Sequence, residues 1–231
     1  MTLTHRLIIV AITELVFVVA TRVVLHYLPW TSVEAELIRT ALRIATALVY
    51  WWLLKTLILS RTANLPRFKS PAVLLALLLF LSIPALVGNY QLTSDAAILF
   101  AITSLPVGIK EEFLFRGIVQ NLLAERYGSP KAILVTSAIF TLWHVGVWNP
   151  TVWTFSQIFF AGVILGLIYV GSGSILTVIA LHTVYDAIFC FTPFTANPLN
   201  ENWGFIPLLG SVGLAAYWTF GGKARRSSPA K

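Results

Sequence analysis

The sequence predicts an all-α fold, a polytopic bundle of transmembrane helices. Of its 231 residues, 58% are hydrophobic and only 11% are Asp, Glu, Lys or Arg, and the mean hydropathy is +0.83. A soluble domain carries about 25% charged residues, and it needs polar surface to cover its core. Intrinsic disorder is excluded too, because it requires low hydrophobicity and dense charge. Long apolar segments recur along the whole chain, which completes the argument for a membrane bundle.

Eight apolar segments follow one another between connections that contain turn residues, such as Gly128-Ser129-Pro130 and Asn149-Pro150. A hydrocarbon core of about 30 Å takes about 20 helical residues to cross. The third segment is short and contains Pro84. We therefore predict eight spans, at residues 7–28, 38–59, 72–87, 96–123, 132–147, 153–169, 174–191 and 205–220.

The first two spans contain ionisable residues. Glu14 and Arg22 make the first span too polar for a cleavable signal peptide, and it lacks a clear small-residue cleavage site. Arg39, Arg43 and Lys55 lie in the second span. We assign these five residues structural roles, although the sequence identifies no partner for Glu14.

Basic residues alternate between the connections, which predicts the topology. They follow the second, fourth and last spans, and the other connections lack Lys and Arg. By the positive-inside rule both termini are cytoplasmic. We thus expect one transmembrane domain at residues 1–222 and a basic cytoplasmic tail at 223–231. The net charge of +7 reflects this topology, so the expected partner is the lipid bilayer and not nucleic acid.

Three motifs place ionisable side chains in the middle of later spans, where each costs several kcal/mol unless it is paired or hydrated. At 1.5 Å of rise per residue, Glu111, His144, His182 and Asp186 lie about 18, 20, 12 and 18 Å from the cytoplasmic edge. We therefore expect three spans to bring carboxylate and imidazole groups together. The motifs are Glu111-Glu112 with Arg116, Phe140 with His144, and His182 with Asp186.

Helix geometry separates the roles within the first motif. Glu112 and Arg116 are spaced i and i+4, which favours an ion pair on one helix face. Glu111 is rotated by about 100° from Glu112 and can face another neighbour. We therefore interpret Glu111 as the reactive acid and the other two residues as its structural brace.

The other two motifs supply the groups that face this acid. His182 and Asp186 share a helix face by the same spacing, so both can face one cavity. Phe140 lies one turn before His144, where its ring can form an apolar wall behind the imidazole. The single Cys190 excludes an internal disulfide and a cysteine-based zinc ribbon.

This set of residues suits peptide hydrolysis. Glu111 can act as general base towards a water and then give the proton to the leaving amine. The two histidines and Asp186 can hold the scissile carbonyl and stabilise the oxyanion. Glu111, His144, His182 and Asp186 would also make a Zn²⁺ site with an open position for water. Both mechanisms remain open from the residues alone, and we favour the one without a cofactor.

In these motifs the chain resembles the intramembrane protease family of CAAX prenyl endopeptidases and bacterial bacteriocin-processing (CPBP, Abi) proteins. That family carries a Glu-Glu-x-x-x-Arg, a Phe-x-x-x-His and a His-x-x-x-Asn/Asp motif on separate spans, in the order found here over residues 96–195. The resemblance implies a bundle of about eight helices that cleaves substrates near the membrane through a water activated by the first Glu. Many members carry Asn where this chain has Asp186.

We therefore predict an intramembrane endopeptidase that cleaves a peptide or a membrane-anchored protein. The resemblance, the short chain and the absence of a targeting segment favour a prokaryotic cytoplasmic membrane. Two alternatives use the same residues differently: a proton-coupled transporter, and a non-catalytic immunity or sorting scaffold of the same fold.

Overall fold

A computed structural model describes residues 3–62, 70–87, 94–145, 151–191 and 201–221, and these residues form an all-helical fold. The longer helices are α1 (Leu3–Tyr27), α2 (Val33–Thr62), α3 (Pro71–Val87), α4 (Ser94–Glu112), α5 (Asn121–Tyr127), α6 (Ser129–Trp143), α7 (Val152–Ser172), α8 (Ile175–Cys190) and α9 (Phe205–Ala216). A π-helix, η1 (Phe113–Gln120), joins α4 to α5, and a second one, η4 (Tyr217–Gly221), extends α9. A short 3₁₀ turn, η3 (Glu201–Gly204), precedes α9.

Each predicted span coincides with helical structure, but most boundaries differ by one to five residues, and two of these differences have a clear local cause. The fifth span was expected to run to Val147, whereas α6 ends at Trp143. The N–H of His144 bonds to the carbonyl of Thr141 at 3.0 Å, a tightening of the last turn that closes the helix. Residues 146–150 lie outside the described part of the chain.

The second span begins earlier than expected, at Val33, so that Glu34 and Glu36 belong to a helix and not to a connection. The N–H of Ala35 donates to Ser32 Oγ at 3.2 Å, which satisfies one of the free donors at the helix start. Carboxylates in the first turn are also stabilised by the positive end of the helix dipole. These local effects extend the helix beyond its most apolar stretch.

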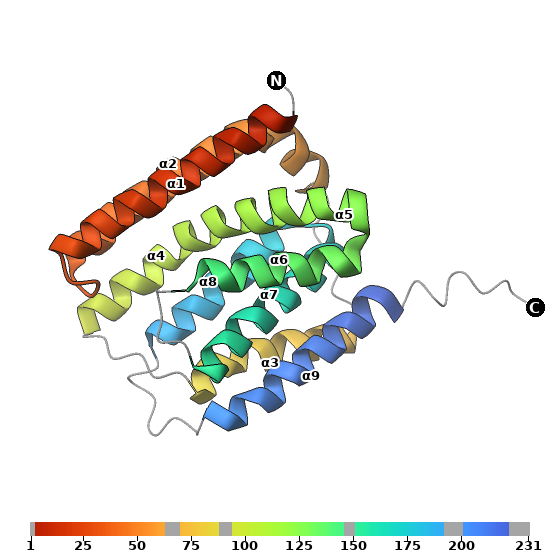
Figure 1. Cartoon of the computed structure of the whole chain (residues 1–231). Helices are drawn as coiled ribbons and strands as arrows, with labels where there is room; N and C mark the ends of the chain where they lie inside the picture. The colour runs from red at the N-terminus through yellow and green to blue at the C-terminus, as the bar shows by residue number, and fades with distance from the viewer. Residues whose placement is uncertain (1–2, 63–69, 88–93, 146–150, 192–200, 222–231) are drawn as a thin grey trace, which may run out of the picture.

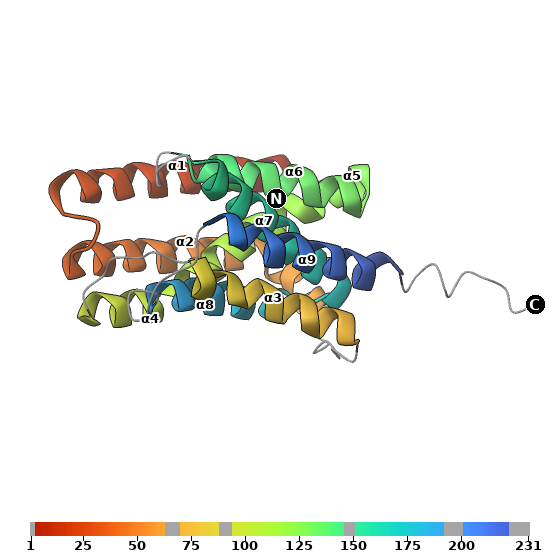
Figure 2. The same ribbon diagram turned by 90° about the horizontal axis from the view of Figure 1, so that it is seen from below.

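The helices form layers around the long rod made by α4, η1 and α5 (Figure 1). The hairpin of α1 and α2 lies on one side of this rod, and α3 and α9 lie side by side on the opposite side of the molecule. Helices α6, α7 and α8 fill the space between, with α8 packed along α4 and α7 packed along α6. The view from below shows the first part of α4 apart from α1, with α2 between them (Figure 2).

Two helices in the described part of the chain are long and apolar enough to cross a membrane by themselves, at Leu7–Tyr27 and Val152–Ser172. Three shorter apolar helices cover Pro71–Val87, Ile175–Cys190 and Phe205–Gly221. Among the remaining predicted spans, the helices α2 and α4 each contain several charged residues. The number of spans and the orientation of the termini therefore stay predictions.

Helices α6 and α7 approach closely because glycine lies at their contact. A Cβ atom built on Gly162 would lie 3.1 Å from Ser137 Cβ and 3.2 Å from Ser137 Cα, which is tighter than most Cβ contacts in proteins. Four residues later, Gly166 faces Gln120 and Ile133 in the same way. This spacing of small residues is typical of closely packed membrane helices.

The substitution Gly162→Ala is expected to lower the free energy of unfolding by about 1–3 kcal/mol, because the backbone of Ser137 cannot move away without separating the two helices. Gly213→Ala in α9 is the matched control, since its added Cβ would have no atom within 4 Å. Unfolding in SDS, followed by circular dichroism, measures both variants. Equal stability of the two variants would show that the contact at Gly162 is loose.

Candidate active site

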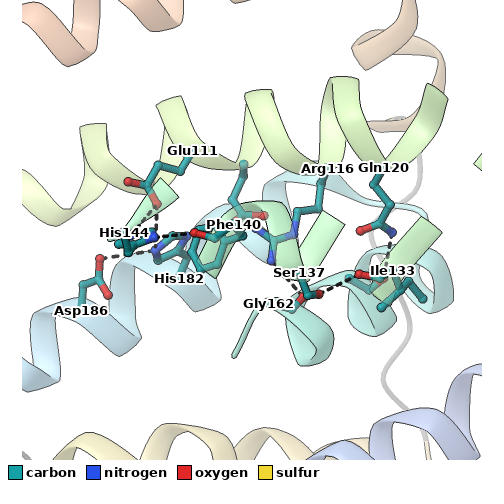
Figure 3. Close-up of polar contacts among 12 residues, drawn as sticks. Glu111, Arg116, Gln120, Ile133, Ser137, Phe140, His144, Gly162, His182 and Asp186 are labelled. Carbon is teal, nitrogen blue, oxygen red and sulfur yellow. Dashed lines mark hydrogen bonds and ion pairs between the residues drawn. The ribbon is translucent and has the colours of Figure 1, made fainter. Parts of the chain in front are cut away.

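The candidate site lies where the end of α4, the end of α6 and the middle of α8 meet (Figure 3). Glu111 Oε2 lies 3.9 Å from His144 Nε2 and 3.9 Å from His182 Nε2. These separations are too long for direct hydrogen bonds, and contacts of this length are often bridged by a water. The structure thus brings together an acid and two imidazoles from three helices that are far apart in sequence.

The side chains of the site are only partly exposed at the protein surface. The exposed fractions are 13% for Glu111, 17% for His144 and 9% for His182, and 33% for Asp186. Glu112 and Arg116, by contrast, have side chains with no exposed surface. The Glu111 side chain therefore keeps a small exposed surface, although its Oε2 atom is buried, whereas the side chain of its neighbour Glu112 is fully enclosed.

His182 has a carboxylate on each side of its ring. Its Nδ1 donates to Glu112 Oε1 at 2.7 Å, because a carboxylate in this position accepts. Its Nε2 lies 3.4 Å from Asp186 Oδ2 and points to the same side as Glu111. Glu112 thus fixes the ring so that Nε2 faces the site, which is how an outer-shell partner orients a functional imidazole.

His144 is oriented by its own helix. Its Nδ1 donates to the carbonyl of Phe140 at 2.7 Å, which leaves Nε2 on the side of Glu111. The ring of Phe140 lies with its centroid 4.6 Å from that of His144 and 6.1 Å from that of His182. The same ring lies 5.1 Å from the guanidinium of Arg116. The Phe140 ring therefore lies next to both imidazoles and to the buried cation.

Arg116 connects the site to α7. Its Nη1 donates to Glu112 Oε1 at 2.8 Å and its Nη2 donates to the carbonyl of Gly162 at 3.0 Å. One turn later, Gln120 Nε2 donates to the carbonyl of Gly166 at 3.2 Å. Gly166 leaves room for Gln120, because a Cβ atom at this position would lie 2.9 Å from Gln120 Oε1. The bonds of Arg116 form a hydrogen-bonded series from Gly162 through Arg116 and Glu112 to His182.

The backbone that carries this brace is a π-helix, which the sequence analysis did not predict. Helix η1 begins directly after Glu112 and includes Arg116. Its i→i+5 pattern makes a wider turn than an α-helix, and such segments are common at functional sites. The residues of η1 other than Val119 are buried, so the wider turn is enclosed by its neighbours.

The residues do not form a preorganised zinc site. Two ligands of a tetrahedral zinc with bonds of about 2.0–2.1 Å lie roughly 3.3–3.4 Å apart. The acid is farther than this from both imidazoles, and within the described residues no group of three or more His, Cys, Asp and Glu side chains is arranged to hold a metal ion. We therefore derive no step that runs through a metal.

Lys110 is the residue at this site that sequence reasoning missed. It is 1% exposed, and its Nζ lies 2.8 Å from Glu14 Oε1 and 2.9 Å from Glu14 Oε2. The hydroxyl of Tyr50 in α2 donates to the same carboxylate. Glu14 therefore has two partners from other helices. A lysine directly before the paired glutamates was the available signal, but it reads equally well as a residue near a helix end.

A comparison with protein families agrees with the three motifs. Residues 93–188 match the family model described as type II CAAX prenyl endopeptidase Rce1-like, which confirms the resemblance inferred from the sequence. The match includes every residue of the candidate site and nearly all of α4 to α8. No curated protein and no solved structure matches the chain. The matched family consists of membrane-integral proteases, so the match over residues 93–188 supports a CAAX-type membrane endopeptidase in general.

Proposed function

We propose, from the family match of residues 93–188, that the chain is an intramembrane endopeptidase in which Glu111 activates the attacking water. The observation that supports this most strongly is the position of Glu111 Oε2, 3.9 Å from the Nε2 atoms of both His144 and His182. A water between these three atoms would have an acceptor for its proton and a second group to orient it. This arrangement is what general base catalysis of hydrolysis requires.

In the proposed reaction Glu111 takes a proton from the water, and the resulting hydroxide attacks the carbonyl carbon of the peptide bond. His144 accepts a hydrogen bond from the water through Nε2, since its Nδ1 is bonded to the carbonyl of Phe140. Glu111 then gives the proton to the amide nitrogen as the C–N bond breaks. The products are a peptide with a new carboxylate and a peptide with a new amine.

His182 is the group that we assign to the oxyanion. Carboxylate oxygens face both of its ring nitrogens, Glu112 at Nδ1 and Asp186 at Nε2, so both nitrogens have acceptors for N–H groups. A protonated Nε2 can turn its hydrogen bond to the developing negative charge on the carbonyl oxygen. Asp186 keeps this nitrogen directed to the site. Such a preoriented donor stabilises the transition state more than it stabilises the substrate.

The substrate that we propose is a peptide or a membrane-anchored protein that reaches the site from the bilayer of a prokaryotic cytoplasmic membrane. The test uses purified protein in liposomes with two fluorogenic probes, a farnesylated CAAX peptide and a peptide with an apolar anchor but no prenyl group. Cleavage of either probe into an acid and an amine, identified by mass spectrometry, is the expected result. A proton flux through the liposomes without any cleavage would favour a transporter instead.

Removal of metals is expected to leave this cleavage unchanged. The reaction is run with 1,10-phenanthroline and with EDTA, and the metal content of the protein is measured by plasma mass spectrometry. The expected result is the same rate in both reagents, because Glu111 is the base. A rate that falls with a chelator and returns with added Zn²⁺ would contradict the metal-free mechanism.

A further inference from the structure

The buried ion pair between Lys110 and Glu14 has no role in the reaction described above. Lys110 is 1% exposed and Glu14 is 6% exposed. Ionised groups inside a membrane protein are costly unless they are paired, and functional sites are where such costs are usually found. Glu14 also lies outside the part of the chain that matches the protease family.

The surroundings of the Lys110 ammonium connect three helices. Its partner Glu14 lies in α1, and Tyr50 of α2 donates to that carboxylate. The ammonium lies 4.0 Å from the centroid of the Phe17 ring in α1 and 5.2 Å from the centroid of the Trp143 ring in α6. Both distances suit cation–π contacts. The pair therefore ties the hairpin of α1 and α2 to α4 and to the end of α6.

The two reactive side chains are direct neighbours of these anchored residues. Glu111 follows Lys110, and His144 follows Trp143. In α4 successive side chains are rotated by about 100°. Lys110 faces Glu14, Glu111 faces the two imidazoles, and Glu112 faces Arg116 and His182. Three consecutive charged residues thus have partners in three directions, which fixes the rotation of α4 about its axis.

We propose that Lys110 is a positioning residue for the endopeptidase reaction, and that its ion pair with Glu14 holds Glu111 at the correct rotation and depth relative to His144. This inference rests on the function proposed above. Helix α1 thereby has a role in the site, although its carboxylate does not touch the reacting atoms. Without the pair, α4 keeps its contacts with α8 but loses the contact with α1 that fixes its rotation.

The first test measures kcat and KM of Lys110→Met in liposomes. A change of position of about 1 Å at a reacting group can cost up to about 10²-fold, so kcat is expected to fall by about 10- to 100-fold, with KM unchanged. Lys110→Arg keeps the cation and is expected to recover most of the rate. The double variant Glu14→Gln/Lys110→Met is expected to be no slower than Lys110→Met alone, because both changes remove the same contact.

Thr103→Val is the matched control. Thr103 lies on α4 two turns before Lys110, is buried, and donates to Glu36 Oε1 of α2 at 2.7 Å. The substitution Thr103→Val therefore removes another buried contact between α4 and the hairpin of α1 and α2, and leaves the contacts of Glu14 intact. Its kcat is expected to equal that of the wild type.

A second test does not depend on activity. The chain contains four histidines, so nitrogen NMR after selective labelling of histidine resolves the rings of His144 and His182. Lys110→Met is expected to shift the Nε2 signals of these rings, and Thr103→Val is not. If the wild type cleaves neither probe, the proposed function fails and the NMR result alone decides the positioning role. A folded Lys110→Met variant with wild-type kcat and unchanged ring signals would overturn the inference.

Discussion

Glu111→Gln is expected to lower kcat by about 10³-fold in a protein that is folded as well as the wild type, since removing a general base typically costs 10²- to 10⁴-fold. Gln has nearly the same shape as Glu but cannot take a proton from water. The brace is left intact, because Glu112, Arg116 and His182 keep their hydrogen bonds to one another. The measurement is the initial rate of probe cleavage at saturating substrate, together with the SDS-unfolding midpoint.

Glu125→Gln is the control for this experiment. It makes the same chemical change on the same rod of helices, at an exposed residue of α5 that takes no part in the site. Its rate is expected to equal that of the wild type. Turnover by Glu111→Gln at the wild-type rate would remove Glu111 from the role of general base.

Glu112→Gln is expected to have the opposite pattern, a large loss of stability. The carboxylate of Glu112 balances the Arg116 guanidinium, and the side chains of both have no exposed surface. Neutralising one partner leaves a buried charge without compensation, which costs about 3–5 kcal/mol. The unfolding free energy in SDS measures this loss. A loss of about 1 kcal/mol or less, typical of exposed ion pairs, would contradict the account.

The double variant Glu112→Gln/Arg116→Met separates charge from shape. It removes both members of the pair and leaves no unpaired charge, so it is expected to be more stable than Glu112→Gln alone. Its cleavage rate is expected to stay low, because His182 loses the carboxylate that fixes its ring. Stability and rate would then respond differently to the same pair of residues.

Residue spacing predicted much of this site. The i, i+4 spacing of Glu112 and Arg116 corresponds to a hydrogen bond of 2.8 Å. The rotation of Glu111 away from Glu112 corresponds to its position beside the Nε2 atoms of His144 and His182, whereas Glu112 bonds to Nδ1 of His182. These features follow from the period of about 3.6 residues in a single helix, so they can be predicted from the spacing of residues in the sequence. The depth estimates placed the acid and the imidazoles at intermediate depth in three different spans, and the structure brings these three side chains close together.

The features that were missed depend on contacts between helices. The partner of Glu14 is Lys110, 96 residues away, and the bond from His182 to Glu112 joins residues 70 apart. No local pattern determines such pairs, because they follow from how the helices pack. The π-helix after Glu112 was missed for a related reason, because its wider turn is enclosed by neighbouring helices. The sequence of η1 contains no signal that distinguishes it from an α-helix.

The proposed reaction depends on the ends of α4 and α6 and the middle of α8, which bring Glu111, His144 and His182 to one place. The most direct measurement is crosslinking of engineered cysteine pairs by dibromobimane, in a Cys190→Ser background that removes the single native cysteine. The pairs are Glu111→Cys with His144→Cys and Glu111→Cys with His182→Cys. The control pairs Glu111→Cys with Val184→Cys, because Val184 lies on α8 but is exposed on another face. Rapid crosslinking of the first two pairs and none of the control is the predicted result. Equal crosslinking of all three pairs, or of none, would contradict the site on which the proposed reaction depends.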